Sequence, residues 1–340
     1  LAMPVGNPVS ATEALARGLR TTFVDTYQRL LAEAHPLLKK VMDLGLPSDK
    51  SSELYAYFES SPHPTRWPRG EDIPADAFRA RNWTVENYDW AKKVSWHSND
   101  EADDQTKSLV DRVRDVAGAF QILPERIFFQ VLTGSVDLDL LPVVPTAPDG
   151  AALFATTAGG AARFGVTGGN IVTGTGVATV AAVHTDLYGG IARFLRMQDT
   201  EGQPLWPPEL VGRGITIVYG SANELVFRQA FSQMNHVQIV QNVAAAENVA
   251  AAAPSNVVLN SGLRFNLWSS PRILDNDWFV FLDGGPKKAI FEQVREPLQD
   301  DVEDFGNSDR TRSTKMKSIQ WHARMGYGVS LPYQAIQINN

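Results

Sequence analysis

One aromatic-rich segment, between residues 51 and 98, limits most strongly what this chain can fold into. Nine of the 32 aromatic side chains fall between Tyr55 and Trp96, in a stretch without helical periodicity. Residues 82–86 are strand-like, and the centre, from residue 60 to 76, is rich in proline, glycine and charge. We therefore predict two long strands joined by an irregular tip. Because an isolated hairpin is only marginally stable in water, its aromatic side chains have to pack against something else.

Two helices are predicted on either side of this hairpin. In residues 99–122 an apolar stripe recurs every three or four positions, as on one face of a helix. The stripe consists of Leu109, Val113, Val116 and Phe120, and it continues to Leu123, directly after this range. Pro124 is expected to end this helix and to begin a short second one that reaches Leu132. Residues 11–42 form the other predicted helix, with a break at Pro36.

The rest of the chain mixes helices and strands. Residues 150–185 carry one charged side chain and eight glycines, so this segment is loop-rich or packed closely on neighbouring backbone. Helices are expected at 179–197 and 223–232, and the alanine-rich residues 241–253 form a helix or an ordered loop. Strands are expected at 215–219, 263–267, 278–282, 288–294 and 316–337, with an acidic loop at 300–309. The chain is therefore assigned to the α+β class.

Composition excludes several kinds of protein. The absence of cysteine removes disulfides, thiolate metal sites and cysteine nucleophiles. No run of 18 apolar residues is present, so no membrane-spanning helix is expected. The net charge of −7 and the lack of a long basic run argue against a dedicated nucleic-acid binder. The first six residues have neither a basic nor an apolar region, so they do not read as a secretory signal.

The motifs of catalysis and of cofactor binding are also missing. No glycine-rich stretch ends in Gly-Lys-Ser/Thr, and residues 174–179 lack the third glycine of a dinucleotide fingerprint. The six histidines are scattered, without metal-ligand spacing. The acidic clusters at 103–104 and 300–304 are interpreted as solvated surface because no base or nucleophile motif stands near them. We therefore predict no catalytic, cofactor-binding or metal-binding residue and no cofactor.

An ordered series of short signatures nevertheless resembles a known family. The pieces on the first half of the chain are Phe23-x-x-x-Tyr27, Tyr55-Ala-Tyr57-Phe58, Trp67-Pro-Arg-Gly70, Val85-x-Asn87-x-x-Trp90, Asp103-Asp104 and Pro124-Glu125. Those on the second half are Asp149-Gly150-x-x-Leu153-Phe154, the turn 199–205, the strand 278–282, Lys288-Ala-Ile-Phe291-Glu and Met325-Gly-Tyr327-Gly. Together, from about Leu19 to Ile338, they resemble the major head (capsid) subunit family of Mu-like phages. Residues 158–178 and 241–253 depart from its pattern.

The resemblance implies the Hong-Kong-97-type capsid fold. Its parts would be an N-terminal arm (1–50), an extended hairpin loop (51–98), a peripheral domain (99–150 and 286–340) with a spine helix (99–122), and an axial domain (151–285). It also implies a structural protein of the virion, assembled in the host cytoplasm. The chain would bind copies of itself as pentamers and hexamers in an icosahedral shell. Scaffolding, portal and decoration proteins are further expected partners, packaged double-stranded DNA is held only non-specifically, and no membrane is involved.

The hairpin aromatics are the candidate inter-subunit contacts, since in that fold the hairpin reaches onto a neighbouring subunit. The candidates are Tyr55, Tyr57, Phe58, Trp67, Trp83, Tyr88 and Trp90. Tryptophan is enriched among interface hot spots, which favours Trp67, Trp83 and Trp90 as anchors. The alternative, that these rings face their own spine helix, stays open.

Two other functions are also kept open. One is a shell on the same fold with another content, such as an encapsulin-like nanocompartment or a gene-transfer particle. The other, less favoured, is a hydrolase that uses scattered carboxylates without a recognisable motif. A compact monomer with a deep pocket would favour the hydrolase, whereas assembled particles would favour a shell.

Overall fold

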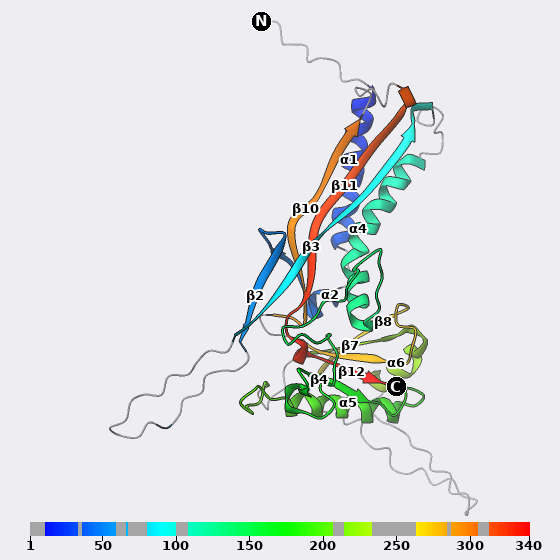
Figure 1. The fold of residues 1–340 in the computed structure, drawn as a ribbon. Helices are drawn as coiled ribbons and strands as arrows, with labels where there is room; N and C mark the ends of the chain where they lie inside the picture. The colour runs from blue at the N-terminus through cyan, green and yellow to red at the C-terminus, as the bar shows by residue number, and fades with distance from the viewer. Residues whose placement is uncertain are drawn as a thin grey trace, which may run out of the picture.

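The computed structural model describes residues 11–32, 36–58, 66, 80–99, 108–206, 214–232, 263–283, 287–304 and 313–340. The chain is elongated, with long strands and two long helices at one end and a smaller sheet with shorter helices at the other (Figure 1). Among the described residues, no helix is long and apolar enough to cross a membrane.

The first sheet has five strands in the order β1-β10-β11-β3-β2. They are β1 (Met42–Pro47), β2 (Ser52–Phe58), β3 (Ala80–His97), β10 (Ile290–Asp304) and β11 (Met316–Val329). β1 is parallel to β10, and the other pairs are antiparallel. Helices α1 (Ala11–Ala32) and α4 (Ser108–Thr133) run along the long strands, and the short α2 (Leu38–Val41) leads into β1 (Figure 1).

A core of large apolar side chains joins these two helices to the sheet. Phe23 of α1 stacks on Trp321 of β11, with ring centroids 4.6 Å apart. Val113 of α4 and Trp96 of β3 are buried in the same cluster. The spacing of the apolar stripe on α4 explains this contact, because residues three and four apart lie on one face of a helix.

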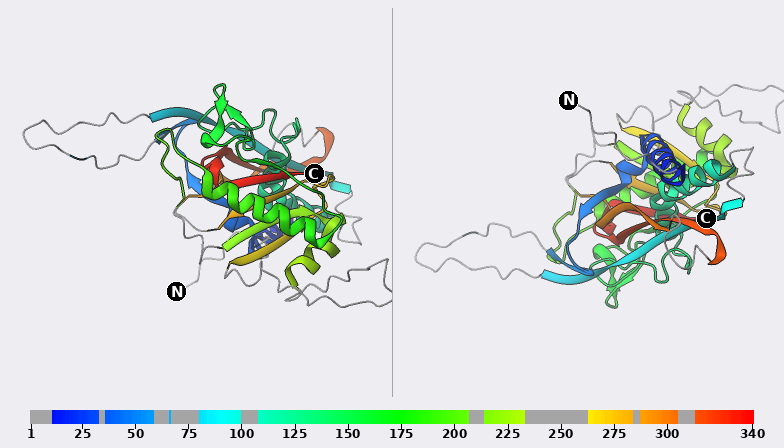
Figure 2. Two further views of the ribbon diagram at one scale, coloured as in Figure 1. Left: turned by 90° about the horizontal axis from the view of Figure 1, so that it is seen from below. Right: turned by 90° about the horizontal axis from the view of Figure 1, so that it is seen from above.

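The second sheet is covered on both faces. Its order is β6-β12-β9-β7-β8. The strands are β6 (Ile171–Thr173), β7 (Gly214–Gly220), β8 (Arg264–Ser270), β9 (Trp278–Leu282) and β12 (Ala335–Asn339). Every residue of β9 is buried, as expected for a strand covered on both faces. Helices α5 (Val180–Arg196) and α6 (Glu224–Ser232) pack on one face, and Figure 2 shows α5 lying across the sheet beside β12.

Helix α4 connects the two sheets. Its second half packs on the face of the second sheet that α5 and α6 leave open, where Phe128 stacks on Trp268 at 5.3 Å and also lies near Phe281. A short hairpin of β4 (Thr157–Ala158) and β5 (Ala161–Ala162) precedes a 3-10 turn, η1 (Arg163–Gly165). Two further turns are η2 (Ser221–Asn223) and η3 (Pro332–Gln334).

The prediction that Pro124 ends a helix was wrong. Pro124 lies inside α4, which continues to Thr133 without a second start. Proline removes one backbone hydrogen bond and crowds the preceding turn. Leu123 and Ile127 are buried on either side of it, and burial of the apolar face that they belong to offsets this cost.

Three strand boundaries also differ from those predicted. Met42, expected at the end of a helix, begins β1, where it pairs with Ile290. Residues 300–304, expected in a loop, continue β10 opposite β11. The strand expected at 316–337 is divided by η3, so that β12 leaves the first sheet and pairs with β9 and β6. The alanine-rich segment 241–253 lies outside the described residues.

Candidate inter-subunit surface

The hairpin leaves the body of the molecule through a short paired region, called here the hairpin root. It consists of Ser52–Phe58 of β2 and Ala80–Glu86 of β3, with Ser52 opposite Glu86 and Phe58 opposite Ala80. From Asn87 onward, β3 pairs with β11 instead. The hairpin was thus predicted correctly at its root, while more than half of its predicted return strand is an inner strand of the first sheet. In the described residues β2 pairs only with β3 and forms an edge of that sheet.

Tyr55 and Trp83 form one aromatic cluster at the hairpin root. They lie directly opposite each other, with ring centroids 5.3 Å apart. The ring of Phe291, from β10, meets Tyr55 edge-on at 5.2 Å. Both candidate side chains are half-buried. Burial raises the pKa of Tyr55, and the nearby Glu53 carboxylate raises it further, so the phenol is neutral and can donate a hydrogen bond.

Tyr88 and Trp90 lie on the opposite face of β3. Alternation along a strand sends successive side chains to opposite faces, so even-numbered residues of β3 are separated from Trp83. Trp90 donates a hydrogen bond from Nε1 to the carbonyl oxygen of Met325 at 3.1 Å, and its ring meets Tyr327 edge-on at 6.1 Å. Both side chains pack against the core of their own chain while staying half-buried.

The other candidate contacts are described only in part. Tyr57 and Phe58 belong to β2, with Tyr57 opposite Arg81 and Phe58 opposite Ala80. Their side chains lie outside the described part of the chain, and so does Trp67 as a whole. The structure therefore brings Tyr55 and Trp83 together and separates them from Tyr88 and Trp90.

A buried polar network lies beside the aromatic cluster, and the sequence did not predict it. Its centre is Gln293 of β10, whose side chain is fully buried. Gln293 Oε1 accepts a hydrogen bond from the Tyr55 hydroxyl at 2.8 Å. Gln293 Nε2 donates to the Val85 carbonyl oxygen at 3.1 Å and to Asn87 Oδ1 at 2.9 Å. The available signal was the Gly-Tyr-Gly pattern of residues 326–328, because glycine inside a strand often marks a close approach of neighbouring groups.

The opposite face of the same strands holds a buried carboxyl group. Glu292 Oε1 accepts a hydrogen bond from the Tyr327 hydroxyl at 2.8 Å, and Oε2 accepts one from the backbone N–H of Gly45 at 3.2 Å. Burial raises the pKa of Glu292 above its ordinary value, against the two hydrogen bonds, which lower it. Burial, together with the adjacent Glu292, also raises the pKa of Tyr327.

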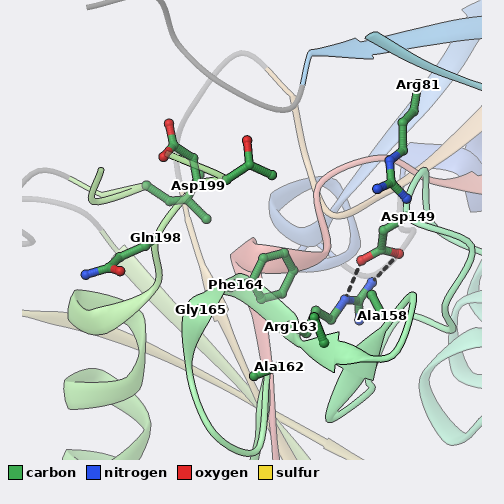
Figure 3. A pocket seen from close by; sticks show the side chains of 12 residues that line it. Arg81, Asp149, Ala158, Ala162, Arg163, Phe164, Gly165, Gln198 and Asp199 are labelled. Atoms are coloured by element: carbon green, nitrogen blue, oxygen red, sulfur yellow. Dashed lines mark hydrogen bonds and ion pairs between the residues drawn. The ribbon is translucent and has the colours of Figure 1, made fainter. Parts of the chain in front are cut away.

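A pocket of about 370 Å³ lies between β3, the β4–β5 hairpin and the turn at 198–205 (Figure 3). At its wall Arg163 makes a two-pronged ion pair with Asp149, through Nε at 2.6 Å and Nη2 at 2.9 Å. Arg163 Nη1 donates to the carbonyl oxygens of Ala152 and Leu153, both at 2.9 Å. Arg81 extends from β3 toward Asp149 (Figure 3).

The bonding of this pocket favours a structural role. The Asp149 carboxylate is held on both oxygens by a buried guanidinium, so it is poorly placed to act as a general base. Within the described ranges, no group of three or more histidine or acidic side chains could hold a metal ion. The Asp149–Arg163 pair therefore acts to hold the β4–β5 hairpin and the turn η1 against the loop at residues 149–153.

Comparison with known proteins shows which family and which solved structures this chain resembles. Residues 15–155 match the family described as Mu-like prophage major head subunit gpT. No curated protein sequence matches the chain. Among solved structures, the capsid of a native GTA particle is similar with a TM-score of 0.53 and 12% identity, covering 89% of this chain and 90% of that one. The capsid of the cyanophage P-SCSP1u has a TM-score of 0.52 and 13% identity, covering 89% and 87%.

A structure of Mycobacterium phage Patience is similar over almost the whole chain, with a TM-score of 0.51, 12% identity and coverage of 99% and 94%. At such low identity these likenesses show the fold, which is the Hong-Kong-97 type. The family match spans most of α1, the strands β1, β2 and β3, and the whole of α4. The chain thus has the Hong-Kong-97-type fold of phage capsid proteins, and its residues 15–155 are similar to the Mu-like prophage major head subunit family.

Proposed function

We propose that copies of this chain build the icosahedral head shell of a tailed phage around double-stranded DNA, and that the hairpin root is one of the surfaces through which they bind. The subunit acts as a structural element and carries out no catalytic step. The match of residues 15–155 to the major head subunit family supports this proposal most directly.

One observation on the molecule itself carries the choice of surface. β2 is an edge strand, so one row of its backbone N–H and C=O groups has no strand partner in the described part of the chain. Leu54, on the face opposite Tyr55, is 65% exposed. The half-buried pair of Tyr55 and Trp83 lies beside this open edge. Such a combination of edge and apolar surface suits burial against another copy of the chain, and stable interfaces of this kind bury large apolar areas.

We also propose that the two sheets belong to different domains of the subunit. The first sheet with α1 and α4 would form the peripheral domain, and the second sheet with α5 and α6 would form the axial domain that meets its copies around five- and six-fold axes. β12 belongs with the second sheet because it pairs with β9. Scaffolding, portal and decoration proteins would be further partners during assembly in the host cytoplasm. The net charge of −7 suits a shell that encloses DNA without binding it tightly.

Electron microscopy of the purified, concentrated chain tests the proposal. We expect shells, tubes, or rings of five or six subunits from the wild-type chain. Y55A and W83A should assemble poorly while their far-UV circular dichroism stays close to that of the wild type, because each removes an aromatic anchor beside an edge strand. W83F, which keeps an aromatic ring, is the matched control and should assemble. Normal assembly of both alanine variants would remove the hairpin root from the interface.

A second candidate has an observation of its own. The capsid of the native GTA particle shares the fold at a TM-score of 0.53, so a shell with other DNA inside is compatible with this architecture. The family match favours the phage head. Sequencing the DNA protected inside particles from the native source separates the two: a single phage genome supports the phage head, and DNA of any other kind supports the second candidate.

A further inference from the structure

We propose that Gly326 and Gly328 of β11 leave a furrow in the surface of the sheet, and that side chains of β10 cross this furrow to contact the hairpin root. Gln293 is then a positioning residue, which sets the direction in which the hairpin leaves the subunit. The inference rests on the proposed function, because the hairpin direction matters only if the hairpin binds another copy. It concerns how Phe291, Gln293, Gly326 and Gly328 act together.

The register places these residues in two rows across the sheet. Gln293 of β10 lies opposite Gly326 of β11, and Gly326 lies opposite Asn87 of β3. Two residues along, Phe291 lies opposite Gly328. Directly opposite residues share a face of an antiparallel sheet, so the missing side chains of β11 leave room between β10 and β3 on that face.

The contacts around the two glycines show that neighbouring atoms fill the space left by the missing side chains. A Cβ on Gly326 would lie 2.4 Å from the carbonyl oxygen of Glu86 and 2.8 Å from both Asn87 Oδ1 and Gln293 Nε2. A Cβ on Gly328 would lie 2.7 Å from the ring of Phe291 and 2.9 Å from Val85. The side chains of β10 therefore cross β11 at these two positions, and any larger residue there would block them.

The side chains that cross the furrow make contact with β2, the outermost strand of the sheet. β10 and β2 are separated by β11 and β3, which at about 4.8 Å per strand amounts to roughly 14 Å. Gln293 meets the hydroxyl of Tyr55 and Phe291 meets its ring, so side chains from both ends of this distance meet over β11 and β3. On the far side Asn87 Nδ2 donates to Ser48 Oγ at 2.8 Å and to the Lys50 carbonyl oxygen at 2.7 Å. The network thus ties the hairpin root to the loop before β2 as well as to β10.

A polar network of this kind suits positioning better than bulk stability. Buried hydrogen bonds add little net stability compared with apolar packing, but they favour the one arrangement in which every partner is satisfied. The hairpin root has only seven strand pairs, and its outer edge is open in the described residues. Without the bridge from β10, the orientation of β2 would depend on its pairing with β3 and on the hydrogen bonds of Glu53 to the preceding loop.

Two substitutions at the bridge test the inference. Q293L removes all three hydrogen bonds at nearly constant volume, and Y55F removes one of them while keeping the ring. For Q293L we expect hydrogen exchange of the β2 amides to be about tenfold faster or more relative to the amides of β10 and β11, since a loosened edge opens locally. Y55F should show a smaller effect of the same kind. In both, assembled shells should lose their uniform diameter.

Q130L is the matched control. Gln130 is another buried glutamine, which bonds both ways with the backbone of Leu141, far from the hairpin root. Q130L should destabilise the chain without changing the exchange of β2 or the uniformity of the shells. Unchanged exchange of β2 in Q293L and Y55F would overturn the inference, and so would faster exchange with shells as uniform as the wild type. If the wild-type chain forms no shells at all, the proposed function fails, while the exchange experiment still decides whether Gln293 holds the hairpin root.

Discussion

At the scale of single residues, the first sheet places two different chemistries on its two faces. Gln293 shares one face with Gly326 and Asn87, and its amide satisfies three polar partners. Glu292, the residue before it, points to the other face, where the Tyr327 hydroxyl and the Gly45 N–H are its partners. A neutral amide under the hairpin root is independent of pH, whereas a buried carboxyl group makes the sheet sensitive to it.

Glu292 gives a pH dependence whose sign follows from its environment. Because burial raises its pKa in the folded chain, the folded state binds the proton more tightly than the unfolded state. The stability that Glu292 contributes is therefore fully present below its ordinary pKa and is lost as the pH rises through its folded-state pKa. For E292Q we expect the difference in Tm from the wild type to become more favourable to the variant between about pH 4 and about pH 7.

A second carboxylate provides a control of opposite sign. Hydrogen bonds from the backbone N–H groups of Asp49 and Lys50 and from the Ser48 hydroxyl lower the pKa of Glu53. Its contribution is present above its ordinary pKa and is lost as the pH falls through its folded-state pKa. E53Q should therefore become less stable relative to the wild type over the same rise in pH. Parallel melting curves of E292Q and the wild type at both pH values would contradict the assignment of Glu292.

At the scale of elements, helices were easier to predict than the limits of strands. Thr179 caps α5 with its hydroxyl on the N–H of Ala182, at the position where the sequence predicted a helix start. Pro124 carries an equally local signal, but packing of the surrounding apolar face overrode it. The length of β3 could not be predicted from the residues near it, because its second half is defined by pairing with β11, more than 200 residues later.

The proline inside α4 leads to a prediction at this scale. P124A restores the N–H that can bond to the carbonyl oxygen of Phe120 and relieves the crowding of the preceding turn. The gain in flexibility of the unfolded chain offsets part of this effect, so we expect the free energy of unfolding to rise by about 2 kcal/mol. Thermal or denaturant unfolding measures it. E125A, one residue on, removes only a partly exposed ion pair with Arg272 and should change stability by less than about 1 kcal/mol. A destabilised P124A would mean that the helix is built around the proline.

Only part of the candidate surface could be predicted from the sequence. The aromatic richness of residues 51–98 was visible at once, and strand alternation alone separates Trp83 from Trp90. Gln293 was not predicted because its partners Tyr55 and Val85 lie 238 and 208 residues away, so nothing near it in the sequence distinguishes it from any polar residue of a strand. The glycines at 326 and 328 were noted as part of a family signature, and only the structure shows that they leave room for crossing side chains.

At the scale of the whole molecule, the apolar cores of the described residues include no side chain of the hairpin root. Two of these cores lie on the two faces of the second sheet and a third lies between the first sheet and its helices. The hairpin root is tied by β10 from one side to the body that these cores form. Residues 59–79 connect in sequence two strand ends that lie opposite each other at Phe58 and Ala80. The body should therefore fold without them.

Replacement of residues 59–79 by a two-residue Asn-Gly turn separates folding from assembly. Such a turn closes an antiparallel pair whose ends are directly opposite, so the root of β2 and β3 keeps its register. We expect a folded chain with nearly unchanged far-UV circular dichroism and thermal unfolding that no longer forms shells in electron microscopy. A second variant, with a flexible glycine-serine linker of the original length, controls for the distance between the strands and should also fail to assemble. Shells formed by the shortened chain would place the decisive contacts between subunits elsewhere on the molecule.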